Sequence, residues 1–448
     1  MLRACIWLTV PALLWGCTQP QPAKAPDSPA VQVTAPTPPP TTAMPSAVTF
    51  TPCTEGLPQR GMWKCDPVFA DVNEDGFLDL AAIPRLGDGA HVWLGDGQGR
   101  WTDSSWGLAM TPQSCGGGLC VGDVNVDGHP DLAVADHCNG VFVYLGDGAG
   151  RWRPATEALY PHDAIPTGSG SASSAMYKGA EDIAIGDVDG DGFLDLLIGA
   201  SDQGGINVYL GDGTGRNWSR SSQGLPTSGW ANRVMLVDVN DDEQLDIVAS
   251  YCEGPRVWLN DGLGDWQPAS TGLPEPITYG LFTGIATGDI NKDGRIDIAA
   301  ANWVDGPEVY LQQADGSWQK TPDVFPDMRG GAIGLALGDI DRDGHLDLVV
   351  SGRLGIDAGY IRGVFLLRGD GAGGWEYVKE CGLPSTGLAA TVGITLGDLN
   401  GDDVLDVAAG SGLIVETAPG RREPVLPARV LVWYTEMKSP PSARGGQR

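Results

Sequence analysis

The feature that most constrains this chain is a nine-residue acidic loop that recurs along it seven times. Its clearest copy begins at Asp187 and reads DVDGDGFLD, with carboxylates at positions 1, 3, 5 and 9 and glycine at position 6. Apolar residues lead into this loop and out of it. Four carboxylates in nine residues repel one another unless a cation lies among them, and Ca²⁺ accepts about 6 to 8 oxygen ligands in irregular geometry. The loop therefore predicts a calcium site between two β-strands.

The seven loops begin at intervals of 50 to 64 residues. We expect the side chains at positions 1, 3, 5 and 9 and the main-chain carbonyl at position 7 to supply the metal ligands. In chain order these candidate ligands are Asp71, Asn73, Asp75, Phe77 and Asp79; Asp123, Asn125, Asp127, His129 and Asp131; Asp187, Asp189, Asp191, Phe193 and Asp195; Asp238, Asn240, Asp242, Gln244 and Asp246; Asp289, Asn291, Asp293, Arg295 and Asp297; Asp339, Asp341, Asp343, His345 and Asp347; and Asp398, Asn400, Asp402, Val404 and Asp406. The sequence thus predicts up to seven Ca²⁺ ions.

The loops do not all predict equally good sites. Position 6 makes a sharp turn that glycine adopts without steric cost, but Glu243 and Asp403 stand there in the fourth and seventh loops. We expect these two loops to bind weakest, and the loop at Asp238 to be empty or distorted. The loops at Asp187 and Asp339 carry four carboxylates each and should bind tightest. The alternative for all seven is that Asp and Asn only cap turns.

The residues around each loop predict four short strands. An apolar run enters the loop and another leaves it, and both are nearly continuous, as in strands covered on both faces. A third run, such as Val143–Leu145, is followed by a Gly-Asp-Gly turn and a tryptophan, Trp152 in this case, which predicts a tight hairpin. A Gly-Leu-Pro link follows several units, for example at Gly272. Seven antiparallel four-stranded units predict an all-β fold, a seven-bladed β-propeller.

The two ends of the repeats predict how the ring closes. After the seventh loop the third strand is expected at Val430–Tyr434, but no tryptophan-bearing fourth strand follows it. A matching stretch precedes the first loop, where residues 50–58 share the landmarks of residues 266–274. We therefore expect Val48–Thr54 to complete the last blade, which removes an exposed sheet edge.

The N-terminal residues predict export. Residues 1–16 carry one positive charge at Arg3 and an apolar stretch too short to span a bilayer as a helix, so they predict a signal peptide. Residues Leu14–Cys17 resemble a bacterial lipobox, which implies lipidation of Cys17. An ordinary signal peptide with a chance cysteine is the alternative.

The remaining boundaries follow from composition. Residues 17–45 contain the lipidation candidate and a proline-rich stretch, which predicts an extended tether. The propeller is expected over residues 46–436, and residues 437–448 predict a disordered tail.

The repeats resemble FG-GAP/VCBS repeats, the family that builds the integrin α-subunit propeller and many secreted bacterial proteins. The resemblance covers residues from about 48 to 436 and rests on the seven loops and their spacing. It implies Ca²⁺ in the loop between the first two strands of each blade. Members of the family include adhesins, sugar-binding lectins and enzyme-associated domains, so the resemblance implies the fold more firmly than the function.

Charge and the remaining motifs narrow the function. The chain has 57 acidic against 28 basic residues and a formal net charge of −29, which argues against nucleic acid or anionic lipid as a partner. The five histidines lack metal-ligand spacing and no catalytic set is evident, so we expect no enzyme activity. Arg368-Gly369-Asp370 spells a cell-adhesion tripeptide, but its place in the repeat predicts a hairpin turn.

Seven cysteines remain besides Cys5 in the signal peptide and the lipidation candidate. Cys115 precedes the first strand of one unit and Cys138 follows its second strand, so both are expected on one rim, where a disulfide between them can form. Cys53 with Cys65 is the other candidate pair.

The two faces of the predicted ring differ. The acidic loops lie on one face, and the opposite face carries inserts at Tyr160–Gly179, Arg353–Gly363 and Ser411–Arg429. Aromatic residues are also expected on that opposite face: Trp230, Tyr251, Tyr279 and Trp303. Variable loops on a rigid scaffold tend to carry binding sites. The alternative is that these rings only cap the ends of the blades.

We therefore expect a non-enzymatic scaffold that binds a protein or glycan on the insert-bearing face. It is expected to be exported and lipid-anchored to the cell envelope, at the outer membrane or cell surface, with no membrane contact besides the anchor. The alternatives are a polysaccharide-degrading enzyme or a lectin on the same propeller, and a purely structural component of the envelope.

Overall fold

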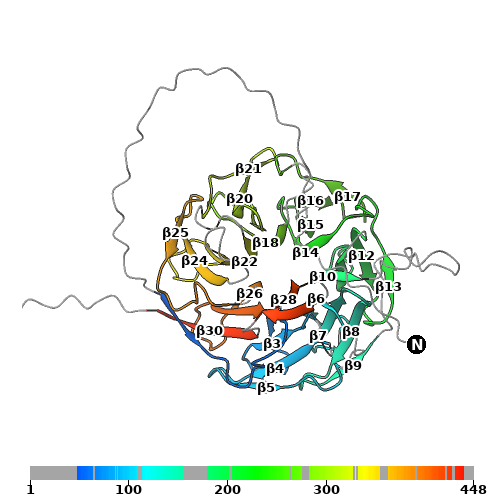
Figure 1. The fold of residues 1–448 in the computed structure, drawn as a ribbon. Coiled ribbons are helices and arrows are strands. Elements are labelled where there is room, and N and C mark those ends of the chain that lie inside the picture. The colour runs from blue at the N-terminus through cyan, green and yellow to red at the C-terminus, as the bar shows by residue number, and fades with distance from the viewer. Residues whose placement is uncertain are drawn as a thin grey trace, which may run out of the picture. The chain divides into compact units, whose positions relative to one another are not determined.

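The computed structural model is a ring of seven four-stranded sheets (Figure 1). It describes residues 48–63, 66–85, 87, 89–108, 114–155, 179–200, 204–251, 253–262, 264–274, 282–325, 328, 331–353, 362–388, 391–418, 421–425 and 429–437. The expected signal peptide, Cys17, the tether and the tail beyond Met437 lie outside these residues. Among the residues described, no helix is long and apolar enough to cross a membrane.

Six blades take their four strands from the chain in consecutive order, each pairing antiparallel with the next. They are β2 (Val68–Ala70), β3 (Asp79–Ala82), β4 (His91–Gly95) and β5 (Trp101–Asp103); β6 (Gly116–Gly122), β7 (Asp131–Asp136), β8 (Gly140–Gly146) and β9 (Trp152–Pro154); β10 (Ala180–Gly186), β11 (Asp195–Ala200), β12 (Ile206–Gly211) and β13 (Trp218–Arg220); β14 (Ala231–Val237), β15 (Asp246–Tyr251), β16 (Gly254–Asn260) and β17 (Trp266–Pro268); β18 (Phe282–Gly288), β19 (Asp297–Asn302), β20 (Gly306–Gln312) and β21 (Trp318–Lys320); and β22 (Ala332–Gly338), β23 (Asp347–Gly352), β24 (Gly363–Gly369) and β25 (Trp375–Val378). We refer to the four strands of a blade, from the axis outward, as A to D.

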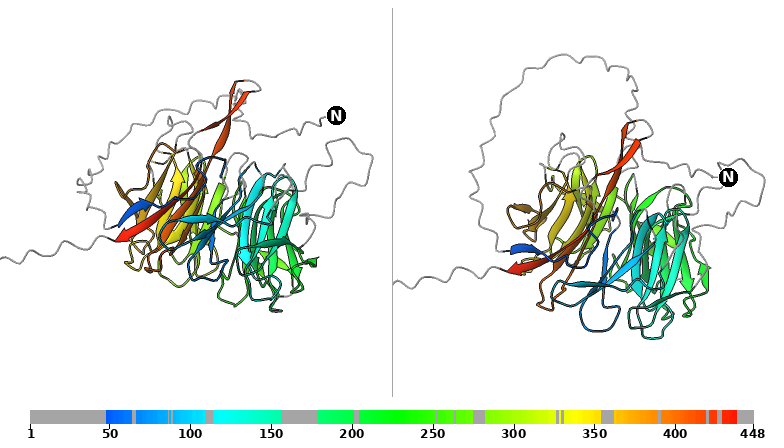
Figure 2. Two further views of the ribbon diagram at one scale, coloured as in Figure 1. Left: turned by 90° about the horizontal axis from the view of Figure 1, so that it is seen from below. Right: turned by 60° about the horizontal axis from the view of Figure 1, so that its bottom comes forward.

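The seventh blade closes the ring with strands from both ends of the repeat region. Its order is β26 (Thr391–Gly397), β27 (Asp406–Ser411), β30 (Val430–Met437) and β1 (Val48–Pro52). Strand β1 pairs antiparallel with β30, from Val48 opposite Met437 to Pro52 opposite Trp433 (Figure 2). The seven blades and the closing N-terminal strand are thus confirmed, although β1 ends two residues before the expected Thr54 and β30 runs one residue past the expected boundary at 436.

Strand B is the most buried strand of each blade, since it lies between two partner strands and between two neighbouring blades. All six residues of β7, β11, β15, β19, β23 and β27 are buried. Apolar side chains of adjacent blades pack together, as where Val208 of the third blade meets Ala249 and Trp258 of the fourth. Because both faces of strand B contact protein, its sequence runs almost continuously apolar instead of alternating.

A two-stranded hairpin leaves the seventh blade within the expected insert at residues 411–429. Its strands are β28 (Leu413–Ala418) and β29 (Arg421–Val425). The hairpin projects from one face of the ring (Figure 2). That face is opposite the acidic loops, because β27 begins at the seventh loop and ends where the hairpin starts. The other two expected inserts lie mostly outside the described residues.

The Gly-Leu-Pro links form the joints between blades. Gly272 has a left-handed backbone, with φ at +92°, and a Cβ added to it would lie 2.0 Å from the carbonyl oxygen of Trp318 in the next blade. The Trp318 indole donates a hydrogen bond to the Ala269 carbonyl, 2.9 Å away, across the same joint. A glycine packs in the same way against the first residue of the next D strand at Gly56, Gly107 and Gly224, and Gly382 packs against Phe50 in the middle of β1. Glycine is therefore needed at these joints for backbone conformation and for space.

We predict that Gly272→Ala destabilises the protein more than Gly316→Ala. Gly316 also has a left-handed backbone, with φ at +78°, but no atom lies within 4 Å of an added Cβ. The control should cost about 1 kcal/mol of unfolding free energy from backbone strain alone. Gly272→Ala should cost about 3 kcal/mol, because the joint between two blades must open as well. Urea unfolding measures both, and equal losses would contradict the role of the joint.

Candidate metal loops and the opposite face

The aspartate at position 9 fastens each acidic loop to its sheet. In the third loop, Asp195 is fully buried and accepts the N–H of Val188 at 2.7 Å and that of Gly211, at the end of strand C, at 2.9 Å. The other six loops repeat both bonds, with Asp79, Asp131, Asp246, Asp297, Asp347 and Asp406 as acceptors. One carboxylate thus links the loop, strand B and strand C.

The carboxylates at positions 1 and 5 fold the rest of the loop. In the third loop Asp187 accepts the N–H of Gly192 at 2.9 Å, and Asp191 accepts that of Phe193 at 2.8 Å. Both bonds recur in all seven loops, and the bond to position 1 always measures 2.8 or 2.9 Å. The N–H groups orient these carboxylates, and each oxygen keeps a second lone pair for another partner.

Two residues of each loop have left-handed backbones. Position 6 was expected to have a left-handed backbone. It has one even where glycine is missing, with φ at +67° for Glu243 and +64° for Asp403. Glu243 still donates its N–H to Asp238 at 2.8 Å, so the backbone of the fourth loop is not distorted, while the weaker ion binding expected there stays a prediction. Position 4 is also left-handed in every loop, including the β-branched Val126, with φ at +56°. Such strain persists only where the surroundings hold the loop firmly.

Position 3 divides the loops into two kinds. In five loops an asparagine donates its side-chain N–H to the position 5 carboxylate, as Asn73 does to Asp75 at 2.9 Å. In the third and sixth loops an aspartate stands there and cannot donate. In these two loops the carboxylates of positions 1, 3 and 9 lie within 4.8 Å of one another: Asp187, Asp189 and Asp195, and Asp339, Asp341 and Asp347.

The loop residues fit Ca²⁺. Their donors are carboxylate, amide and carbonyl oxygens, which are the ligands of a hard cation, and no soft or nitrogen ligand is needed. In the sixth loop the Asp339 Oδ1 atom is buried and has no hydrogen-bond partner. A buried, unpaired carboxylate oxygen costs free energy unless a cation or donor reaches it. The residues that would hold the ion are therefore those predicted from the sequence.

Burial raises the pKa of every position 9 carboxyl group. The pKa is raised to about 6 in five of them and to about 7 in the other two, Asp347 and Asp406. Backbone N–H groups oppose the shift, whereas the charges of neighbouring loop carboxylates add to it. Without an ion, the folded loops thus bind protons more tightly than the unfolded chain does.

All three residues of the tripeptide Arg368-Gly369-Asp370 contact other residues of the propeller. Arg368 pairs with Asp341 of the sixth loop, the Arg368 Nε atom lying 2.5 Å from a carboxylate oxygen. Gly369 is buried in β24 and pairs with Trp375, and Asp370 accepts the N–H groups of Ala372 and Gly374 at 2.8 Å. The tripeptide is therefore the predicted turn between strands C and D.

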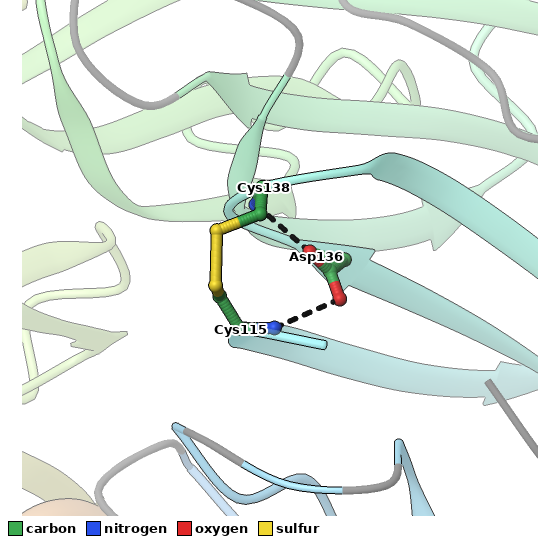
Figure 3. Close-up of side chains that lie close together, drawn as sticks. All are labelled: Cys115, Asp136 and Cys138. Atoms are coloured by element: carbon green, nitrogen blue, oxygen red, sulfur yellow. Dashed lines mark hydrogen bonds between the residues drawn. A yellow bond between two sulfur atoms is a disulfide. The ribbon is translucent and has the colours of Figure 1, made fainter. Parts of the chain in front are cut away.

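The expected disulfide between Cys115 and Cys138 is present, with its Cα atoms 5.6 Å apart (Figure 3). Asp136 lies between the two cysteines and accepts the N–H of each, at 3.1 and 2.8 Å. Because both sulfur atoms are bonded to each other, this group is a brace and not a metal site. The second predicted pair, Cys53 with Cys65, is wrong, because Cys53 is a free, buried thiol; Cys65 lies outside the described residues.

Three charged residues meet at the axis of the ring, and we call them the axial triad: Asp66, Asp182 and Arg233. They come from the first, third and fourth blades, and Arg233 pairs with both aspartates. Burial raises the pKa of Asp182 to about 7, which the Arg233 charge opposes and the Asp66 charge adds to. The triad thus links the first blade to the third and fourth blades, near the end of the axis opposite the metal loops.

A second charged group lies beside the triad on the face opposite the acidic loops. We call it the Glu181 cluster: Arg85, His137, Glu181 and Trp230. Glu181 is nearly buried and pairs with Arg85 at 3.3 Å and with the His137 ring. The Trp230 ring lies against His137 with centroids 5.5 Å apart, and its buried indole N–H has no hydrogen-bond partner.

Sequence reasoning found the loops but missed the triad. The aligned repeats contain its signal, because all three triad residues stand five positions before an acidic loop, where the other blades have Gly118, Gly284, Gly334 and Gly393. A Cβ on Gly118 would lie 1.9 Å from an oxygen of Asp182. A charged residue at a position where the other blades have glycine therefore indicates a contact across the axis. The Glu181 cluster has a weaker signal. Arg85 and His137 share one repeat position, fourteen residues after the start of an acidic loop, but Glu181 and Trp230 stand at two other positions.

The fold and the loops together define a β-propeller with one acidic loop in each blade. A family model described as an FG-GAP-like repeat matches residues 71–134, 123–198, 187–249, 238–300 and 289–350. These overlapping matches cover more than half of the chain, and each runs from one acidic loop through the next. The chain belongs to the FG-GAP-like repeat family.

Curated relatives agree with that assignment, and a solved structure agrees with the fold. Integrin alpha-7 of Rattus norvegicus is 33% identical over 144 residues, 29% of this chain and 12% of the relative. Integrin alpha-PS5 of Drosophila melanogaster is 33% identical over 158 residues, 32% of this chain and 15% of the relative. The chain thus matches less than a sixth of these relatives. BBS1N, solved in complex with ARL6DN, superposes with a TM-score of 0.54 at 11% identity, over 87% of this chain and 97% of that one.

We predict that the metal-free protein becomes more stable as the pH falls from about 7.5 to 5.5. The seven position 9 carboxyl groups have a raised pKa in the folded state, so their contribution to stability is complete below the unfolded value of about 3.9 and is lost as the pH rises through about 6 to 7. Melting temperatures of chelator-treated, dialysed protein measure this. A melting temperature that falls over the same interval would contradict the account.

Proposed function

We propose that this protein is a calcium-stabilised, non-enzymatic propeller that binds a protein or glycan on the face opposite its metal loops. The observation that carries the proposal is the sevenfold repetition of one loop geometry. In every loop the carboxylates of positions 1, 5 and 9 are oriented by the same backbone donors. Turn capping alone does not require the additional Asp or Asn at position 3.

Calcium would act on stability through the carboxylates that it neutralises. The residues that would hold it are the side chains at positions 1, 3, 5 and 9 and the carbonyl at position 7 of each loop. When bound, the ion supplies positive charge to a group of acids that burial and mutual repulsion disfavour. Position 9 would transmit this to the blade, because Asp195 and its six counterparts bind strands B and C as well as the loop.

The opposite face has the features of a binding surface. The Glu181 cluster places an aromatic ring, a carboxylate and a guanidinium side by side, a combination that can hold the hydroxyl groups and apolar face of a sugar or a polar protein side chain. The hairpin β28–β29 projects from the same face (Figure 2). The Cys115–Cys138 disulfide braces the turn that carries His137.

Export and anchoring remain part of the proposal. We infer that residues 1–16 direct export and that Cys17 carries a lipid, with residues 17–45 holding the propeller away from the membrane at the cell surface or in the periplasm. The Cys115–Cys138 disulfide supports an oxidising compartment, where such bonds persist.

Removing calcium should lower the melting temperature of the full chain, and re-adding it should restore the original value. The reason is that ion binding to the folded state alone stabilises that state by mass action. Differential scanning calorimetry with chelator, with millimolar Ca²⁺ and with Mg²⁺ as the control makes the test. A melting temperature that does not respond to calcium would contradict the structural role of the loops.

Binding on the opposite face is tested with a glycan array and a bacterial or host surface-protein array. We expect Trp230→Ala to lower binding at least about tenfold if Trp230 contacts the ligand as other aromatic anchors do. The control is Trp106→Ala, which removes a 75% exposed ring from the link between the first and second blades. Equal binding by both variants would place the ligand elsewhere, and release of shortened glycan products would favour the enzyme instead.

A further inference from the structure

Strand C of the sixth blade carries a charge where every other blade carries an uncharged side chain. The position is the one before the residue that donates its N–H to the position 9 aspartate. In the sixth blade this residue is Arg368. Its counterparts are Leu94, Leu145, Leu210, Leu259, Leu311 and Tyr434.

Arg368 reaches into the metal loop of its own blade. Its guanidinium pairs with Asp341 at position 3, the Nε atom lying 2.5 Å from the carboxylate. The Asp341 side chain is only 8% exposed and that of Arg368 26% exposed, so water screens the pair weakly. The sixth loop is thus one of the two loops that carry four carboxylates. One of these carboxylates, that of Asp341, is already paired with the Arg368 side chain.

The third loop has the same acids without such a cation. Asp189 stands at position 3, and among the described residues it forms no ion pair. One oxygen of each of the Asp187, Asp189 and Asp195 carboxylates lies within 4.8 Å of the other two, so an added cation would relieve the repulsion among the three. Its strand C residue is Leu210, which carries no charge.

We propose that Arg368 is a built-in counter-cation that sets the calcium affinity of the sixth loop below that of the third. This inference rests on the proposed calcium binding. An arginine is always charged, and here it both neutralises one ligand and repels a divalent ion held by the same carboxylates. The sixth loop keeps acceptors for an ion, including the unpaired Asp339 Oδ1, so its site is weakened but not lost. The two four-carboxylate loops are therefore not equivalent.

The test needs the affinity of each loop separately. Hydrogen–deuterium exchange of the full chain at graded Ca²⁺ concentrations provides it, because each loop lies in its own peptides and becomes protected when its ion binds. In the unaltered protein the third loop should reach half-protection at lower Ca²⁺ than the sixth. Arg368→Leu, which introduces the residue of the first five blades, should lower the sixth-loop midpoint about tenfold at low salt and leave the third-loop midpoint unchanged.

The reverse change is the matched control. Leu210→Arg places a guanidinium in the third blade at the position of Arg368, and it should raise the third-loop midpoint by a similar factor without moving the sixth. It also tests the proposal if Arg368→Leu fails to fold. A sixth-loop midpoint that stays the same or rises in Arg368→Leu overturns the inference alone. If calcium protects none of the loops, the proposed calcium dependence fails with it.

Discussion

The structure depends on one buried carboxylate in each blade. The position 9 aspartate accepts N–H groups from its own loop and from strand C, so that it fixes the loop to the two central strands of the sheet. The same burial raises its pKa to about 6 or 7 and places it among other acids, a repulsion that a bound cation would relieve. The proposed metal binding would therefore act on stability through these seven side chains.

Three kinds of contact hold the ring together: contacts between neighbouring blades, pairing of the two chain ends, and contacts across the axis. Glycine and tryptophan join neighbouring blades at the Gly-Leu-Pro links. Strand β1 completes the seventh blade and covers the edge that β30 would otherwise expose. The axial triad connects the first blade with the third and fourth. With these contacts the propeller is a rigid support on which the Glu181 cluster and the β28–β29 hairpin can vary without loss of the fold.

The repeats made most of this architecture predictable from the sequence. Blade number, strand order and the closing strand all followed from landmarks with a fixed spacing, and so did the disulfide between Cys115 and Cys138. Three features did not follow. The left-handed backbone at position 4 is shared by residues as different as Val126 and Glu74, so no residue type announces it. The axial triad joins residues of different blades, and the pairing of Arg368 with Asp341 depends on side-chain direction, which spacing alone does not give.

We propose above all that the seven acidic loops hold cations in the folded ring. A crystal structure of the propeller grown in calcium-rich solution, with anomalous scattering data, tests it most directly. We predict seven blades and an anomalous peak among the carboxylates of the acidic loops, strongest at Asp187, Asp189 and Asp195. A ring with another number of blades, or loops that show no peak in saturating calcium, would contradict the account.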